Sequence, residues 1–180
     1  NHTDHQNGEV LAASINRDAI GIVGRLDGAV RVVSGTGPEI AISLDDLEAK
    51  REEEGTTRAL IKGVLAGIRE HSGKIGGFQA YITSDVLIGA GLSSSAAFET
   101  LIGTIESGLY NDMELSAVDI AVIGQYAENV YFGKPCGLMD QTASSVGNLV
   151  HIDFADKSHP KIERISCDLE AYGYSLCITD

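Results

Sequence analysis

The feature that most constrains this chain is a glycine–serine stretch at residues 89–97, with the sequence GAGLSSSAA. It lies between a strand-like run over residues 80–88 and a segment, residues 97–109, in which apolar residues recur at helical spacing. Glycines leave backbone N–H groups uncovered, and the first turn of a helix presents unpaired N–H donors at the positive end of its dipole. Together these features favour a polyanion, so the stretch predicts a phosphate-binding loop between a strand and a helix.

The stretch matches neither of the two common nucleotide loops. No lysine follows the glycines as in the GxxxxGK[ST] pattern, and a serine stands where the dinucleotide fingerprint has its third glycine. A plain strand-to-helix turn with a serine N-cap is the alternative interpretation. The residues of this stretch alone leave both interpretations open.

Composition and charge narrow the class of protein. The chain has 180 residues, of which 43% are hydrophobic, and this length is sufficient for one substantial core. Its formal net charge of -13 opposes nonspecific binding to nucleic acid or to an anionic membrane, and no apolar run approaches membrane-spanning length. The three cysteines are odd in number and show no CxxC spacing, which favours a reducing cytoplasm over a disulfide or zinc framework. No pattern indicates an oligomeric state.

The rest of the chain reads as alternating strands and helices without an internal repeat or linker. Residues 9–25 and 29–34 predict an antiparallel pair joined by a turn at Asp27-Gly28, and residues 39–47 predict a further short strand. Core-facing helices are expected at residues 57–71 and 117–131, and a short helical segment is expected to end at Val146. The charge run at residues 48–54 predicts a solvated helix end or loop. Residues 148–154 and 171–178 predict two strands separated by the polar stretch 156–163.

Two acidic residues call for an explanation. Glu128 lies near the end of the helix predicted at residues 117–131, where a carboxylate opposes the helix dipole. It is therefore either exposed or compensated by a cation. Asp140 falls near the start of the next helical segment, where an acidic residue is common and needs no function. His2 and His5 have a spacing that occurs in metal sites, but no further ligand set accompanies them.

Four motifs taken together resemble a known family. HTDxxNG at residues 2–8, GAGLSSSAA at 89–97, AE at 127–128 and CGLMDQ at 136–141 resemble the galactokinases of the GHMP small-molecule kinase superfamily. The resemblance implies an α+β fold, that of the GHMP kinase N-terminal domain (ribosomal protein S5 domain 2-like), with a mixed or antiparallel sheet backed by helices. It implies that residues 1–180 form an ATP- and sugar-binding domain, roughly the N-terminal half of a kinase, truncated at both ends and without the C-terminal domain.

The resemblance also implies roles for individual residues. The loop would bind the ATP phosphates, and Ser95 and Glu128 would hold Mg²⁺. Asp140 would take the proton from the sugar C1 hydroxyl or orient that hydroxyl. Sugar contacts would come from Asn1, His2, Asp4, the backbone of Gly137, and Asp140. The residues assigned to ATP are Gly89, Ala90, Gly91, Leu92, Ser93, Ser94 and Ser95.

The activity that the resemblance implies is ATP-dependent phosphorylation of D-galactose to α-D-galactose 1-phosphate. Asn1 stands where the family normally has a glutamate, His5 where a tyrosine is usual, and Leu87 where a proline commonly precedes the loop. The family's arginine that pairs with the catalytic aspartate would precede residue 1, so the 180 residues are expected to be inactive alone. Two alternatives stay open: a related kinase for another hexose or amino-sugar, favoured by Asn1, and a galactokinase-like sensor without catalysis.

Overall fold

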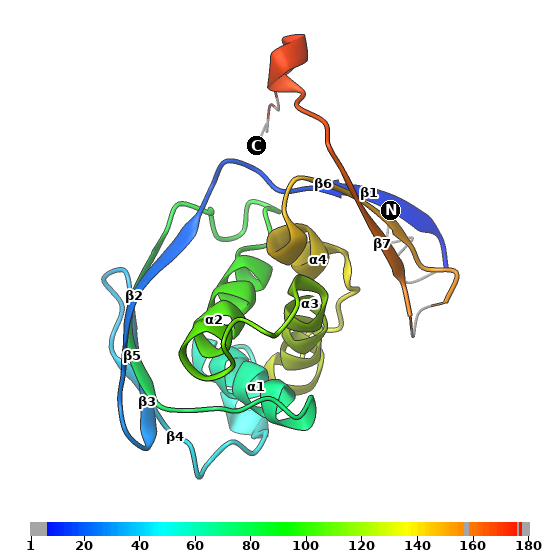
Figure 1. The fold of residues 1–180 in the computed structure, drawn as a ribbon. Coiled ribbons are helices and arrows are strands. Elements are labelled where there is room, and N and C mark those ends of the chain that lie inside the picture. Colours follow the sequence, from blue (N-terminus) through cyan, green and yellow to red (C-terminus); the bar gives the residue numbers. More distant parts are fainter. Residues whose placement is uncertain (1–6, 157–158, 176, 178–180) are drawn as a thin grey trace.

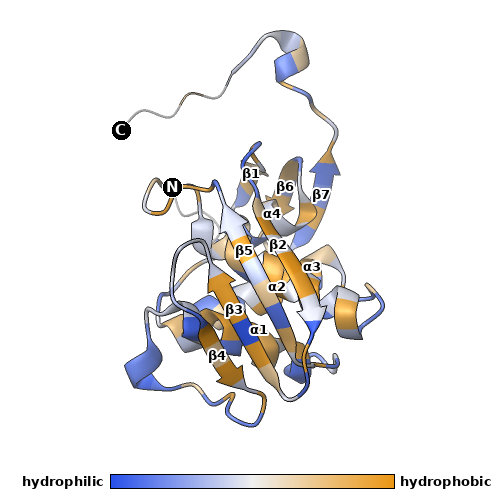
Figure 2. Cartoon of the chain, turned by 90° about the vertical axis from the view of Figure 1, so that its left-hand side faces the viewer, coloured by the Kyte–Doolittle hydropathy of each residue, from blue (hydrophilic) through white to orange (hydrophobic). Residues whose placement is uncertain are grey.

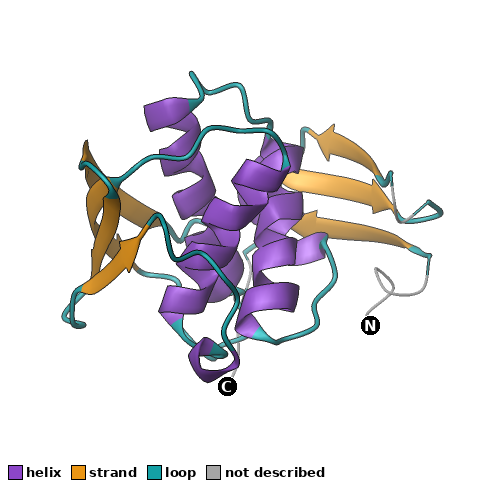
Figure 3. Cartoon of the chain, turned by 90° about the horizontal axis from the view of Figure 1, so that it is seen from below, coloured by secondary structure: helices purple, strands orange, loops and turns teal. Residues whose placement is uncertain are grey.

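The computed structural model describes residues 7–156, 159–175 and 177, and it places a layer of helices between two β-sheets (Figures 1 and 3). The helices are α1 (Thr57–Glu70), α2 (Ser94–Tyr110), α3 (Ala117–Tyr126) and α4 (Met139–Val146). The sheets contain strands β1 (Glu9–Ala13), β2 (Ala19–Arg25), β3 (Ala29–Ser34), β4 (Ile40–Ser43), β5 (Phe78–Ser84), β6 (Leu149–Asp153) and β7 (Lys161–Ile165). This arrangement confirms the predicted α+β class.

The larger sheet has the order β2-β5-β3-β4, and Figure 2 shows it from its outer side. Strand β5 runs antiparallel to β2, with Tyr81 opposite Ile22, and parallel to β3, with Ala80 opposite Val32. The antiparallel hairpin predicted across Asp27-Gly28 is therefore wrong, because β5 lies between the two strands. The turn residues specify only a reversal of the chain, whereas the pairing is decided by a segment 50 residues further along.

The smaller sheet is antiparallel, with the order β1-β6-β7. The predicted strand at residues 148–154 is confirmed as β6. The strand predicted at residues 171–178 is wrong: residues Glu170–Tyr172 form a 3-10 turn, and Tyr172 and Tyr174 are exposed. The third strand is β7, which begins inside the stretch expected to be a polar connection. Edge strands carry charged residues on their solvent side. In β7 these charged residues are interspersed with only two isoleucines, so the sequence of the strand resembles a polar connection.

Helices α1, α2 and α4 confirm the helices predicted for their segments. The helix predicted over residues 117–131 changes character after Tyr126, where a π-helical turn, Ala127–Phe132, replaces the α-helix. Gly63 of α1 faces this turn, and a Cβ at Gly63 would lie 2.7 Å from Ala127 Cα. The glycine is therefore required for the close approach of α1 to the π turn. Such turns are rare in proteins, and those that occur are often found at functional sites.

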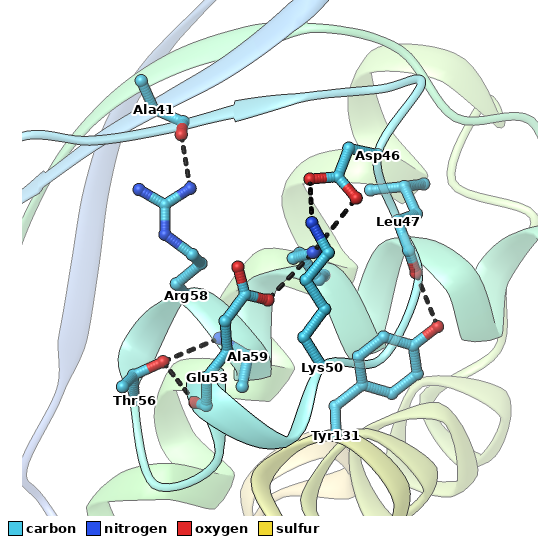
Figure 4. Close-up of polar contacts among 10 residues, drawn as sticks. Ala41, Asp46, Leu47, Lys50, Glu53, Thr56, Arg58, Ala59 and Tyr131 are labelled. Carbon is cyan, nitrogen blue, oxygen red and sulfur yellow. Dashed lines mark hydrogen bonds and ion pairs between the residues drawn. The ribbon is translucent and has the colours of Figure 1, made fainter.

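The charge run before α1, residues 48–54, contains no buried residue, which agrees with the solvated helix end or loop that was expected, and Glu53 connects it to the core. It forms a 3-10 turn, Arg51–Glu53. Lys62 of α1 is 1% exposed, and its ammonium lies 2.9 Å from Glu53 Oε2 and 3.6 Å from Asp46 Oδ1. Tyr131 of the π turn donates a hydrogen bond to the Leu47 carbonyl at 2.8 Å (Figure 4). A buried lysine needs such partners, so these contacts fix the segment between β4 and α1.

The core between the large sheet and the helices is mainly aliphatic. Its residues with 0% exposure come from β3, α1, β5, α2, α3 and the π turn: Val30, Val32, Ile61, Leu65, Ile68, Phe78, Ile102, Ile123 and Ala127. A smaller cluster under the three-stranded sheet contains Val150, Ile152 and Phe154. Because α2 packs into the core along most of its length, its first turn has a fixed position relative to both sheets.

Candidate active site

The glycine–serine loop leaves its backbone uncovered, as predicted. Gly89 and Gly91 have φ angles of +79° and +71°, and the space around each is open, because an added Cβ would meet no atom within 4 Å. Ser93 has a φ of +56° and occupies the N-cap position of α2, but its side chain makes no capping hydrogen bond. The geometry therefore differs from the plain serine-capped turn that was the alternative interpretation.

The strand before the loop is shorter than predicted. Strand β5 ends at Ser84, and Leu87 and Ile88 are 64% and 92% exposed. The extension of the strand to residue 88 is therefore wrong. Four hydrogen bonds fix the start of the loop instead. The Asp85 carboxylate accepts from the Asp18 N–H at 2.5 Å and from an Arg17 guanidinium N–H at 3.3 Å, and the Asp85 N–H donates to the Asp18 carbonyl. The Val86 N–H donates to Ser84 Oγ.

Two serines of the loop contact the two acidic residues that the sequence singled out. Ser93 Oγ donates to Asp140 Oδ2 at 2.5 Å, and Ser95 Oγ donates to Glu128 Oε1 at 3.0 Å. Asp140 is the second residue of α4 and is exposed, whereas Glu128 lies in the π turn. Both carboxyl groups are therefore placed at the first turn of α2, although they are 47 and 33 residues away from their serine partners.

Glu128 is buried and fully hydrogen-bonded. It is 2% exposed, so the interpretation of it as an exposed residue is wrong, and Lys134 is the compensating cation, with its ammonium 3.0 Å from Oε1. Burial raises the pKa of Glu128, but hydrogen bonds from Lys134, the Cys136 thiol and Ser95 outweigh it, so the pKa lies below its usual value. Glu128 is therefore ionised at neutral pH.

Gln141 and Glu99 extend this cluster into the core. The sequence alone predicted no role for Gln141, although it belongs to the CGLMDQ motif, and did not single out Glu99. The Gln141 amide nitrogen donates to Glu128 Oε2 at 2.8 Å and to Glu99 Oε2 at 3.2 Å, and both Gln141 and Glu99 are 0% exposed. Burial, with the nearby charge of Glu128 as a second cause, raises the pKa of Glu99 to about 8. At neutral pH, Glu99 is protonated, and the buried pair of carboxyl groups carries one negative charge.

An open cleft of about 660 Å³ lies beside the loop. Gly91, Leu92, Ser93 and Asp140 line it on one side, and residues of the connection between β1 and β2 line the other. Gly137, Ser95 and Glu128 do not line this cleft. Of the residues assigned to the sugar, Asn1, His2 and Asp4 lie outside the described residues. The connection between β1 and β2 contributes residues that carried no motif: Ser14, Ile15, Arg17 and Asp18.

The donor set at Ser95 and Glu128 fits a magnesium ion carried by a nucleotide. Within residues 7–156, 159–175 and 177, no group of three or more His, Cys, Asp or Glu side chains could hold a metal ion by itself. Mg²⁺, however, commonly takes one or two protein oxygens and completes its shell with phosphate oxygens and water. One carboxylate and one hydroxyl at the N-terminus of α2, beside an uncovered glycine loop, supply that part of the shell.

In the described part of the chain, no helix has the length and apolar character needed to cross a membrane.

The comparison with known families assigns the chain to one kinase family. The family model described as "GHMP kinases N terminal domain" matches residues 59–148, which include most of α1, the glycine–serine loop, Glu128 and Asp140. The chain therefore belongs to the GHMP kinase family.

Its curated relatives include galactokinases. The chain is 33% identical over 183 residues to a galactokinase of Lactobacillus helveticus, covering 99% of this chain and 47% of the relative. It is 35% identical over 182 residues to one of Streptomyces coelicolor, covering 99% and 46%. The chain thus spans about half the length of these relatives.

Solved structures of kinases also resemble this chain in fold. A Lactococcus lactis galactokinase in complex with galactose superimposes with a TM-score of 0.80 at 26% identity, covering 92% of this chain and 44% of that one. A mevalonate kinase of Methanococcus jannaschii has a TM-score of 0.72 at 17% identity, covering 95% and 53%, and this likeness extends to the fold alone.

Proposed function

We propose that the protein carrying this chain is a MgATP-dependent sugar kinase that phosphorylates the C1 hydroxyl of D-galactose to give α-D-galactose 1-phosphate. The observation that carries the proposal is the convergence at the first turn of α2, where Ser95 contacts Glu128 and Ser93 contacts Asp140. Phosphoryl transfer requires little covalent chemistry from a protein, because positioning and charge neutralisation supply most of the catalysis. A phosphate loop, a metal carboxylate and a second carboxylate beside them meet these needs.

The residues divide into three tasks. The uncovered N–H groups of residues 89–95 receive the phosphates of ATP at the positive end of the α2 dipole. Ser95 and Glu128 would hold Mg²⁺, which would supply charge neutralisation on the phosphates. Asp140 accepts the proton of the attacking sugar hydroxyl or orients that hydroxyl. The hydroxyl oxygen forms the new bond to the γ-phosphorus, the bond from this phosphorus to the bridging oxygen of ADP breaks, and ADP leaves. The contact between Asp140 and Ser93 places this carboxylate beside the phosphate loop.

The sugar is assigned to the side of the loop that contains the cleft and Asp140. We assign its hydroxyl contacts to Asn1, His2, Asp4, the backbone of Gly137, and Asp140, with residues 1–180 forming the ATP- and sugar-binding domain. The net charge of -13 argues against nucleic acid or an anionic membrane as partner, and the cysteine pattern supports a cytoplasmic location.

The experiment that tests this function is an ADP-release assay on the protein expressed from its complete reading frame, with a panel of hexoses and amino-sugars. We expect turnover with D-galactose, and loss of that turnover in Asp140→Ala. Turnover with another sugar, and none with D-galactose, would support the second candidate, a related kinase for another hexose or amino-sugar. The observation that favours this candidate is Asn1, which stands where the family normally has a glutamate. Binding of sugar and ATP without turnover would overturn the proposal in favour of a sensor.

A further inference from the structure

The ammonium group of Lys134 contacts Glu128 Oε1, an oxygen of the carboxylate that is proposed to bind the metal. Lys134 Nζ and Ser95 Oγ each lie 3.0 Å from Glu128 Oε1. The other oxygen, Oε2, accepts the Gln141 amide at 2.8 Å. A positive charge is therefore already placed on the Glu128 oxygen that also contacts Ser95, the second group that would hold a divalent cation.

The two partners of this ion pair are anchored very differently. The Glu128 side chain is 3% exposed and is held from behind by Gln141. The Lys134 side chain is 62% exposed and lies on the connection that follows Gly133, whose φ is +79°. Glu128 is the one hydrogen-bond partner recorded for the ammonium among the described residues. Lys134 can therefore leave without disturbing the core, whereas Glu128 cannot.

Electrostatics makes the two cations alternatives. A buried carboxylate with no cation beside it is costly, so Glu128 needs a counter-charge when no metal is bound. A lysine ammonium and a divalent ion on the same carboxylate oxygen repel each other, because both are positive and only a few ångströms apart. Binding of the metal therefore weakens the contact between Lys134 and Glu128.

We propose that Lys134 is a built-in competitor of the divalent cation, which neutralises Glu128 in the metal-free site and is displaced when the metal–nucleotide complex binds. The inference rests on the proposed function, since it takes Glu128 and Ser95 as the metal groups. It adds a residue that sets how strongly nucleotide binding depends on the metal.

The test is binding of Mn²⁺, measured by electron paramagnetic resonance of the free ion, and of a non-hydrolysable ATP analogue, measured by calorimetry with and without Mn²⁺. In Lys134→Met we expect Mn²⁺ to bind about three- to tenfold more tightly, because a partly exposed ion pair no longer competes. The metal-free analogue should bind more weakly by a similar factor. Lys134→Arg should keep the wild-type values.

Lys74→Met is the matched control, because it removes the same charge from an exposed lysine near the other end of α2. If Lys134→Met fails to fold, Lys134→Gln replaces it, since glutamine keeps a polar side chain that can donate a hydrogen bond. Mn²⁺ affinity that is unchanged or weaker in the uncharged variants overturns the inference alone. Absence of Mn²⁺–nucleotide binding in the wild-type protein overturns it together with the proposed function.

Discussion

The substitution Glu106→Gln should remove a pH dependence of stability that the structure places in α2. Glu106 is 0% exposed; its Oε2 accepts the Gly76 N–H at 3.2 Å, and its Oε1 has no partner in the described part of the chain. Burial raises its pKa from 4.5 to about 8, and the hydrogen bond from Gly76 offsets little of this. The folded protein therefore keeps a proton that the unfolded chain releases.

The sign and size of the effect follow from linkage. Because the pKa is raised on folding, the stabilising effect is fully present below about pH 4.5 and is lost as the pH rises towards 8. Inside that window one group changes the free energy of unfolding by about 1.4 kcal/mol per pH unit. Between pH 5.5 and 7.5, Glu106 should therefore cost the wild-type protein about 2–3 kcal/mol. Glutamine retains an acceptor for the Gly76 N–H but cannot ionise.

The assay is urea unfolding followed by circular dichroism at pH 5.5 and 7.5. Glu106→Gln should lose about 2–3 kcal/mol less than the wild-type protein over this interval. Glu99 adds a pH dependence of its own, but it does so in both proteins. Glu114→Gln, in the exposed turn after the same helix, is the matched control and should follow the wild-type curve. Equal losses in Glu106→Gln and wild type would refute the reasoning.

Three further outcomes are expected from the active-site region. Asp140→Ala should lower kcat by about 10²–10⁴-fold with little change in unfolding free energy, because Asp140 is exposed; steady-state kinetics with urea unfolding checks both, and retained kcat would contradict the assignment. Gln141→Leu should destabilise the fold by about 1–3 kcal/mol, since it leaves Glu128 Oε2 buried without its donor; equal urea midpoints would argue against this. Gly89→Ala should weaken ATP binding in calorimetry while leaving sugar binding unchanged, because alanine is strained at a φ of +79° and Gly89 does not line the cleft; weakening of both would point to a wider disruption.

The sequence predicted well what short-range patterns determine. The spacing of apolar residues located α1 and α2, and the glycines and serines predicted a loop whose backbone the structure leaves uncovered. The motifs also named Glu128 and Asp140, which the structure brings to the first turn of α2. For Glu128, the sequence raised the possibility of a cation but could not name Lys134, because the π turn that brings the two together has no local signature.

The remaining features depend on contacts between distant segments. Asp27-Gly28 predicted that β2 and β3 pair directly, but β5 lies between them. A turn signal shows where the chain reverses and not whether another strand inserts between the two strands that the turn joins. Strand β7 was missed because the solvent side of an edge strand is charged. Glu99 reads from the sequence as an ordinary helix residue, and only burial beside Gln141 reveals a protonated carboxyl group.

The central claim is that the first turn of α2, Glu128 and Asp140 together form a phosphoryl-transfer site. Phosphorus NMR of the protein expressed from its complete reading frame, incubated with ATP, Mg²⁺ and D-galactose, tests it most directly. The account predicts a new phosphomonoester signal coupled to the anomeric proton of galactose, and its absence in Glu128→Ala and Asp140→Ala. A phosphate on another hydroxyl, no transfer by the wild-type protein, or full transfer by both variants would contradict it.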